Sequence, residues 1–414
     1  MSPTPARPGA KLAAWCGWVL AGGFVLTPII GWLAPLTFAP LLTLMGLLTL
    51  PAVRVEDEDR PVGIAVVTLV LWAAGSSVWS PFTAKGLGDS TAAKLIAETV
   101  VYFAAVCAAR AAAPGGRTVA LNILAYGTAL LGVLMLVEGL TGAMLYRAVR
   151  DAIHDPIRPD LGIKNAAQGL FILAMLAPPA ALAAVRVARA PWLIAPMLTG
   201  LVVTCVTFGY DAPLIALAAC LLAGLAVWRW PGGAPKVLAA VAATFFLTAP
   251  AIVWAVRRSG WYAVLERDVP LSWSQRMGYW RHAADWISDH PLRGWGLDAS
   301  RMFNPGIKLH PHDAALQIWL ELGLIGAMAA AVFWVALLAG MSRKVRDPAL
   351  AVSAATATAY LTFNAFSFGV WQEWWLATGA LAAVACAALQ RQPAVAKARA
   401  PVAARPSTPA VFSE

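Results

Sequence analysis

The stretch that decides the fold class is DAALQIWLELGLIGAMAAAVFWVALLAG, residues 313–340. It is almost wholly apolar and longer than the roughly 20 residues that a helix needs to cross a bilayer. Eleven further apolar runs are long enough to cross as well; they lie near 12–33, 36–52, 63–80, 95–113, 118–138, 165–185, 190–209, 212–229, 236–256, 350–369 and 374–390. The sequence therefore predicts an all-α, polytopic membrane protein with about 12 transmembrane helices.

The composition excludes a soluble globular enzyme. Of the 414 residues, 60% are hydrophobic and 13% are charged, whereas a soluble domain has about 45–50% apolar and about 25% charged residues. All five cysteines lie in apolar stretches, so we expect neither a disulfide framework nor a cysteine metal site. We expect residues 1–390 to form a single transmembrane domain and residues 391–414, rich in Ala, Pro and Arg, to form a disordered cytoplasmic tail.

The distribution of basic residues predicts the topology. With the N-terminus inside, the cytoplasmic segments carry 17 of the 31 basic residues, and the short outer turns carry only Lys85 and Lys94. This bias obeys the positive-inside rule and places both termini in the cytoplasm. The other twelve lie in two outer loops, 139–164 and 257–312, which also hold all five histidines. We expect these loops to form the active site and to bind an anionic ligand.

The second outer loop is predicted to contain an amphipathic helix. Within 272–289, apolar residues recur at steps of four, three, four and three; they are Trp273, Met277, Trp280, Ala284 and Ile287. Such a helix suits the outer membrane surface as a lid anchored by aromatic residues, and it would hold Arg276 as a phosphate ligand. Both roles are compatible.

A turn-rich stretch follows and ends in His310-Pro311-His312-Asp313 at the start of an apolar span. We interpret His312 as a general base, kept neutral by a neighbouring Arg or Lys. A metal site of paired histidines with a carboxylate and a purely structural histidine remain alternatives. Glu321, nine residues later, faces away from His312, and we expect Gly323 and Gly326 to serve helix packing.

These residues resemble a known family. His312-Asp313, nine residues, Gly323, two residues and Gly326 resemble the signature of bacterial O-antigen ligases. Arg276 with Trp280, then HPLRGWGLD at 290–298, is similar to the region that these ligases share with O-antigen and exopolysaccharide polymerases. Arg158 followed by Gly162-Ile163-Lys164-Asn165 resembles the family's arginine-bearing segment before the sixth span.

Two positions depart from the family pattern. Asp313 stands where the family prefers an amide or a hydroxyl, so a carboxylate beside His312 could raise its pKa. Tyr210-Asp211 occupies the outer turn where many relatives have Ser-Arg-Gly. A basic contact is then either missing or supplied by Arg258.

The resemblance implies transfer of a glycan from undecaprenyl diphosphate to lipid A–core, at the periplasmic face of the bacterial inner membrane. It implies that Arg158 and Arg276 grip the diphosphate and that His312 deprotonates the acceptor. Further substrate-binding residues would be Lys164, Arg257, Arg258, His310 and Asp313. The reaction would invert the sugar C1 and need neither a metal nor another cofactor.

Other functions are weighed against this one. A polymerase acting on lipid-linked repeat units shares every quoted motif. A lipid-linked oligosaccharide flippase would place its polar groups near the bilayer midplane, whereas here they concentrate at the outer surface. A cytoplasmic-facing glycosyltransferase would have to use Glu56-Asp57-Glu58-Asp59, in a loop too short for a nucleotide-sugar domain. Nucleic acid binding is disfavoured because topology explains the inner basic residues.

Overall fold

The computed structural model describes residues 9–392, and this part of the chain contains helices and no strands. Each of the twelve expected spans coincides with one long helix: α1 (Ala10–Leu33), α2 (Phe38–Thr49), α3 (Arg60–Ser76), α4 (Thr91–Ala111), α5 (Pro114–Thr141), α8 (Gln168–Arg186), α9 (Ile194–Phe208), α10 (Ala212–Arg229), α11 (Ala234–Arg258), α14 (Ala314–Ala339), α15 (Pro348–Phe366) and α16 (Glu373–Gln390). Ten of the described helices are long and apolar enough to cross a membrane; α3 and α16 are not among them. The predicted fold class is confirmed. The expected tail lies, from residue 393 onward, outside the described residues.

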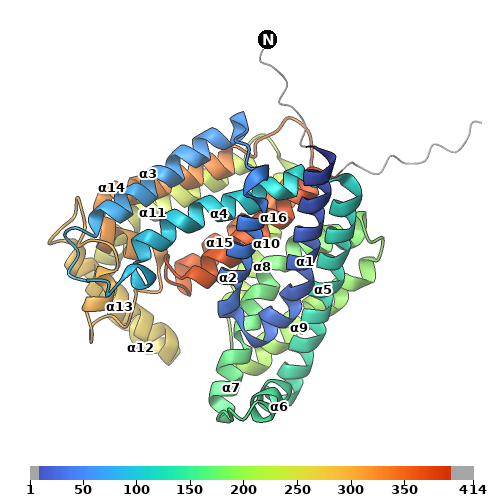
Figure 1. The fold of residues 1–414 in the computed structure, drawn as a ribbon. Coiled ribbons are helices and arrows are strands. Elements are labelled where there is room, and N and C mark those ends of the chain that lie inside the picture. The colour runs from blue at the N-terminus through green and yellow to red at the C-terminus, as the bar shows by residue number, and fades with distance from the viewer. Residues whose placement is uncertain (1–8, 393–414) are drawn as a thin grey trace, which may run out of the picture.

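Four short helices occupy the two outer loops. The first loop contains α6 (Met144–Ala152) and α7 (Pro159–Ala166), and the second contains α12 (Trp261–Asp268) and α13 (Leu271–Ile287). The amphipathic helix predicted over 272–289 is α13, and its residues Met277, Ala284 and Ile287 are buried. In Figure 1 the two pairs of short helices lie at separate lower corners of the molecule.

The long helices pack around two main apolar cores. The first joins α1, α2, α4, α5, α8, α9 and α16, and the second joins α3, α11, α13 and α14. Figure 1 shows α3, α11 and α14 side by side on one side of the molecule, with α1, α5 and α9 on the other. The segment between α15 and α16 contacts both cores.

Helix α14 is interrupted at Gly323, whose φ of 66° and ψ of −162° are open only to glycine. The loop that follows α13 docks into this interruption, because the backbone groups that the helix leaves unpaired must find partners. Four backbone hydrogen bonds join the two segments: Trp295 to Leu320, Gly296 to Glu321, Leu324 to Pro291 and Ile325 to Leu292. Gly294 and Gly323 lie at this interface, since a Cβ on either one would meet the backbone of the other segment, whereas Gly296 packs against Ser76 and Ser80. Gly323 thus serves packing, as predicted, by allowing the backbone of Leu292 and Arg293 to approach α14 closely.

Gly323→Ala is expected to destabilise the protein by about 3 kcal/mol or more. A Cβ at this position would lie 2.4 Å from the backbone of Leu292, and the positive φ adds strain. The thermal unfolding midpoint in detergent measures the loss. Gly63→Ala is the control, because a Cβ at Gly63 in α3 meets nothing within 4 Å. Equal midpoints for the two variants would contradict this account of the broken helix.

The acidic run Glu56-Asp57-Glu58-Asp59 lies in a short inner loop, and all four of its carboxylates are paired with arginines. The ion pairs are Glu56 with Arg391, Asp57 with Arg60, Glu58 with Arg343 and Asp59 with Arg110. Three of these arginines come from distant parts of the chain. The side chains of Asp57 and Glu58 are 84% and 80% exposed, so the run is largely solvated, and its ion pairs link it to distant parts of the chain.

Candidate active site

His312 lies at the outer end of α14 in a left-handed backbone conformation, with φ of 57°. Such a conformation is uncommon for a side chain that is not glycine and is often found at functional sites. Its Nδ1 lies 2.7 Å from the carbonyl oxygen of Ser367. A carbonyl only accepts hydrogen bonds, so Nδ1 carries the proton and Nε2 presents its lone pair. Within residues 9–392 no hydrogen bond to this Nε2 is formed.

His310 contacts the backbone of His312. Its Nδ1 accepts the backbone N–H of His312 at 3.2 Å, and its Nε2 lies 3.3 Å from the side-chain amide of Gln372. Only 7% of the residue is exposed. Burial, the neighbouring His312 and the charge of Arg301 lower the pKa of His310 to about 3. His310 therefore stays neutral and fixes the backbone that carries His312.

Helix α13 brings two further side chains to His312. The ring of Tyr279 is stacked on the imidazole, with centroids 6.0 Å apart and planes inclined by 20°. Arg276, three residues earlier, lies on the same face of the helix. Burial lowers the pKa of His312 below its usual 6.5; the Ser367 carbonyl opposes this effect and the positive charge of Arg276 adds to it. His312 is thus held neutral near pH 7.

Arg276 is a half-buried cation without an acidic partner. Among the residues that the structure describes, no carboxylate forms an ion pair with it, and its guanidinium lies over the ring of Trp273 at 5.3 Å. Burial lowers its pKa, and the neighbouring Tyr210 opposes this effect, but an arginine remains charged. A partly desolvated guanidinium that lacks a carboxylate is suited to an anionic group of a ligand.

Asp313 caps helix α14. Its carboxylate accepts the backbone N–H of Leu316 at 2.8 Å and faces the helix. Burial raises its pKa to about 7, and hydrogen bonds from the Leu316 and Ala315 amides oppose this effect. Since Asp, Asn and Ser all serve as N-caps, this departure from the family pattern preserves the local structure. Asp313 is not among the groups that shift the pKa of His312.

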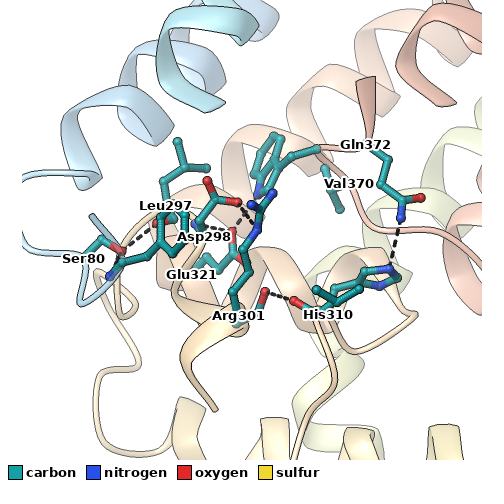
Figure 2. A network of polar contacts seen from close by, with 12 residues as sticks. Ser80, Leu297, Asp298, Arg301, His310, Glu321, Val370 and Gln372 are labelled. Atoms are coloured by element: carbon teal, nitrogen blue, oxygen red, sulfur yellow. Dashed lines mark hydrogen bonds and ion pairs between the residues drawn. The ribbon is translucent and has the colours of Figure 1, made fainter. Parts of the chain in front are cut away.

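Glu321 is fully buried in α14 and bonds three neighbours. Its carboxylate accepts from the Trp371 indole at 2.6 Å, from the Asp298 backbone at 3.1 Å and from Gln317 at 3.1 Å. Figure 2 shows how this network lies beside Arg301 and the pair His310 and Gln372. Glu321 therefore stabilises the outer loops and does not contact His312, as its position in the sequence predicted.

Residues 195–331 match the family model described as O-antigen ligase. This stretch contains Arg276, His310, His312 and the interruption at Gly323. The resemblance to the O-antigen ligase family is confirmed. A protein of Rickettsia conorii and one of Rickettsia felis, both provisionally named polysaccharide ligase, are 29% and 28% identical over 120 residues. Each alignment covers 26% of this chain, and 29% and 30% of the two relatives. The chain thus matches less than a third of either relative's length.

The region that matches the family model contains only part of the predicted site. Arg276, His310 and His312 share one place, whereas Arg158 is 74% exposed at the start of α7 and pairs with Asp160 at 3.0 Å. Helices α7 and α13 lie well apart in Figure 1. Within residues 9–392, no hydrogen bond or ion pair links Arg158 to His312. Three other predicted substrate-binding residues lie outside the group: Lys164 and Arg258 are exposed, and Arg257 pairs with Asp285.

The predicted alternative of a metal site is not supported by the arrangement of side chains. Asp313 faces its own helix. Among residues 9–392, no three His, Cys, Asp or Glu side chains form a group that could hold a metal ion.

Sequence reasoning missed the contribution of the turn between α15 and α16. Ser367 accepts from His312, Gln372 contacts His310, and Phe368 packs edge-on against Phe171 of α8 at 4.8 Å. Tyr210 packs on the same Phe171 at 6.3 Å. Polar residues beside a glycine in a short outer turn were the available signal. This turn connects His310 and His312 to the first core.

The lowered pKa of His312 predicts the acid limb of the pH profile. A general base works when it is deprotonated, so activity falls as pH drops through the pKa of His312, at a pH below 6.5. In Arg276→Gln the loss of a nearby positive charge should raise this pKa and move the limb to higher pH. The dependence of kcat/KM on pH measures both. A limb that stays in place in the variant would contradict the contact.

Proposed function

We propose that the chain is a glycosyltransferase that moves a glycan from undecaprenyl diphosphate to lipid A–core at the periplasmic face of the inner membrane. The observation that carries the proposal is the proximity of His312 to Arg276. Among residues 9–392, nothing bonds the Nε2 of this neutral imidazole, and no carboxylate pairs with the half-buried guanidinium beside it. A base and an anion ligand are what transfer from a sugar diphosphate requires.

The reaction forms a bond between the acceptor oxygen and the sugar C1, and it breaks the bond from C1 to the diphosphate oxygen. His312 Nε2 takes the proton of the acceptor hydroxyl, and the Ser367 carbonyl stabilises the resulting imidazolium through Nδ1–H. Arg276 stabilises the negative charge that develops on the leaving diphosphate. A single displacement of this kind inverts the configuration at C1.

Arg158 belongs to the proposal on the strength of the sequence resemblance. Its ion pair with Asp160 is exposed and therefore weak, so a diphosphate could replace the carboxylate. Arg158 would reach the same diphosphate as Arg276 only if its loop moved toward α13. We propose Lys164 and Arg258 as further contacts for the donor.

A ligase is favoured over a polymerase by the provisional names of the relatives. A transporter is disfavoured by the roles of the buried carboxylates. Glu138 accepts from the Trp32 indole at 2.6 Å and from the Tyr146 backbone at 2.7 Å, and Glu321 is bonded to three neighbours. These two carboxylates bond neighbouring helices and loops of the protein, whereas Glu98, in α4, lines a cavity.

Reconstitution in detergent tests the proposal. Purified protein, lipid-linked glycan and lipid A–core should yield glycan-bearing lipid A–core with inverted C1, and EDTA should leave the rate unchanged. Longer lipid-linked glycan without capped lipid A–core would make the protein a polymerase. No transfer in detergent, together with glycan movement across vesicle membranes, would make it a transporter.

A further inference from the structure

A cavity whose lining includes neither Arg276 nor His312 lies at the ends of α3, α4 and α16. It measures about 380 Å³, within the range of small-molecule sites, about 300–1,000 Å³. Its walls come from the outer turn after α3, the start of α4, the 3₁₀ turn at Ala299–Met302 and the turn before α16. The charged lining residues are three basic and three acidic side chains: Lys85, Lys94, Arg301, Asp89, Glu98 and Glu373.

The balance of charge argues against an anion as the occupant. Lys94 pairs with Glu373 at 2.7 Å, and Arg301 pairs with Asp298 at 3.0 Å. The Arg301 guanidinium also lies 5.2 Å from the ring of Phe82. Two of the three cations are thus already neutralised. Carboxylates and ammonium groups together offer acceptors and donors, which match a neutral ligand that carries hydroxyl groups.

Glu98 brings a buried carboxylate to this cavity, next to the hydroxyl of Tyr102. The residue is 9% exposed, and its Oε2 forms no hydrogen bond within the described chain. A buried acceptor without a partner is costly, so a ligand hydroxyl that donates to it would be favourable. Trp371 lines the same cavity, and its indole N–H is already bonded to Glu321. The ring therefore offers only its apolar surface.

The cavity adjoins the residues that support the proposed base. Trp371 directly precedes Gln372, which contacts His310, and His310 accepts the backbone N–H of His312. The positive charge of Arg301 also lowers the pKa of His310. Figure 2 shows Arg301, His310 and Gln372 in one network. A ligand in the cavity would thus lie next to residues that contact or influence His310.

We propose that this cavity binds a sugar unit of a glycan substrate, with hydroxyl groups donated to Glu98 and Asp89 and with a ring face packed on Trp371. This inference rests on the proposed function. The sugar belongs to either the acceptor or the donor, and both present the same chemistry. Holding a unit here would orient the rest of the chain toward His312.

Saturation-transfer NMR on the full-length protein tests the site with three probes: the delipidated core oligosaccharide, the O-antigen oligosaccharide freed from its carrier, and inorganic diphosphate. Glu98→Leu and the more exposed Asp89→Ala should each weaken one oligosaccharide about tenfold, the loss expected for a hydrogen bond to a charged group. The KM of the matching substrate should rise about as much, with kcat within about twofold. Diphosphate binding should be unchanged.

Asp268→Ala is the control, because Asp268 is an exposed outer carboxylate paired with Arg267; it should leave all three probes unchanged. Unaltered oligosaccharide binding and KM in Asp89→Ala and in folded Glu98→Leu would overturn the site. Loss of diphosphate binding instead would make it an anion site. Sugar binding that these variants abolish, in a protein that transfers no glycan, would sustain the cavity while refuting the proposed function.

Discussion

Replacing His312 with asparagine is expected to lower the rate of glycan transfer by about 10²–10⁴, the usual contribution of a general base. Asparagine tolerates the left-handed backbone of this position better than most residues, so the fold should survive. It lacks a group that can take the acceptor proton near pH 7. The initial rate of product formation in detergent measures the effect.

Two comparisons separate chemistry from structure. His282→Asn is the matched control, since His282 lies on α13 and stacks on Trp286; transfer should stay near wild type. His312→Ala removes the same imidazole but fits the backbone less well, so both His312 variants should lose activity equally. An active His312→Asn enzyme with an unchanged unfolding midpoint would refute the role of the imidazole.

Replacing Arg276 with glutamine is expected to lower the transfer rate by about 10²–10³, as loss of an oriented charge donor does. The guanidinium has no carboxylate partner among the described residues, so its removal should break no ion pair that stabilises the fold. Arg276→Lys keeps the charge and loses the planar fork, and it should recover only part of the rate. Single-turnover rates separate this loss from weaker donor binding.

Arg267→Gln is the matched control, because Arg267 is an exposed arginine on α12 that pairs with Asp268. Its transfer rate should stay near wild type. Arg158→Gln probes the distant arginine in the same assay. If Arg158→Gln is inactive while Arg276→Gln is not, the diphosphate is bound at α7, and the arrangement proposed around His312 is wrong.

The sequence predicted the elements well, because each depends on local composition. The twelve apolar runs correspond to twelve helices, and the spacing in 272–289 corresponds to α13. It also identified His312 and Arg276, which sit on those elements. The sequence could not show that the carboxylate of Asp313 caps α14, because an aspartate that caps a helix and one that contacts the adjacent histidine look identical in a sequence.

Contacts between distant segments were beyond sequence reasoning. The partners of His312 and His310 come from the turn at 367–372, more than fifty residues away. The sequence also did not reveal that α14 is interrupted at Gly323, because the interruption depends on hydrogen bonds to the loop at 291–296. The expected convergence of Arg158 with Arg276 did not appear either, since no pattern within a loop states how far it lies from another loop.

The order of hydrophobic and charged residues alone determined a helical membrane protein, because the bilayer acts on every segment separately. Only the tertiary structure decided which nitrogen of His312 carries the proton, that no carboxylate of the described residues pairs with Arg276, and that a cavity adjoins the residues around His310. These properties depend on the distances between side chains from different helices, and those distances are set by packing.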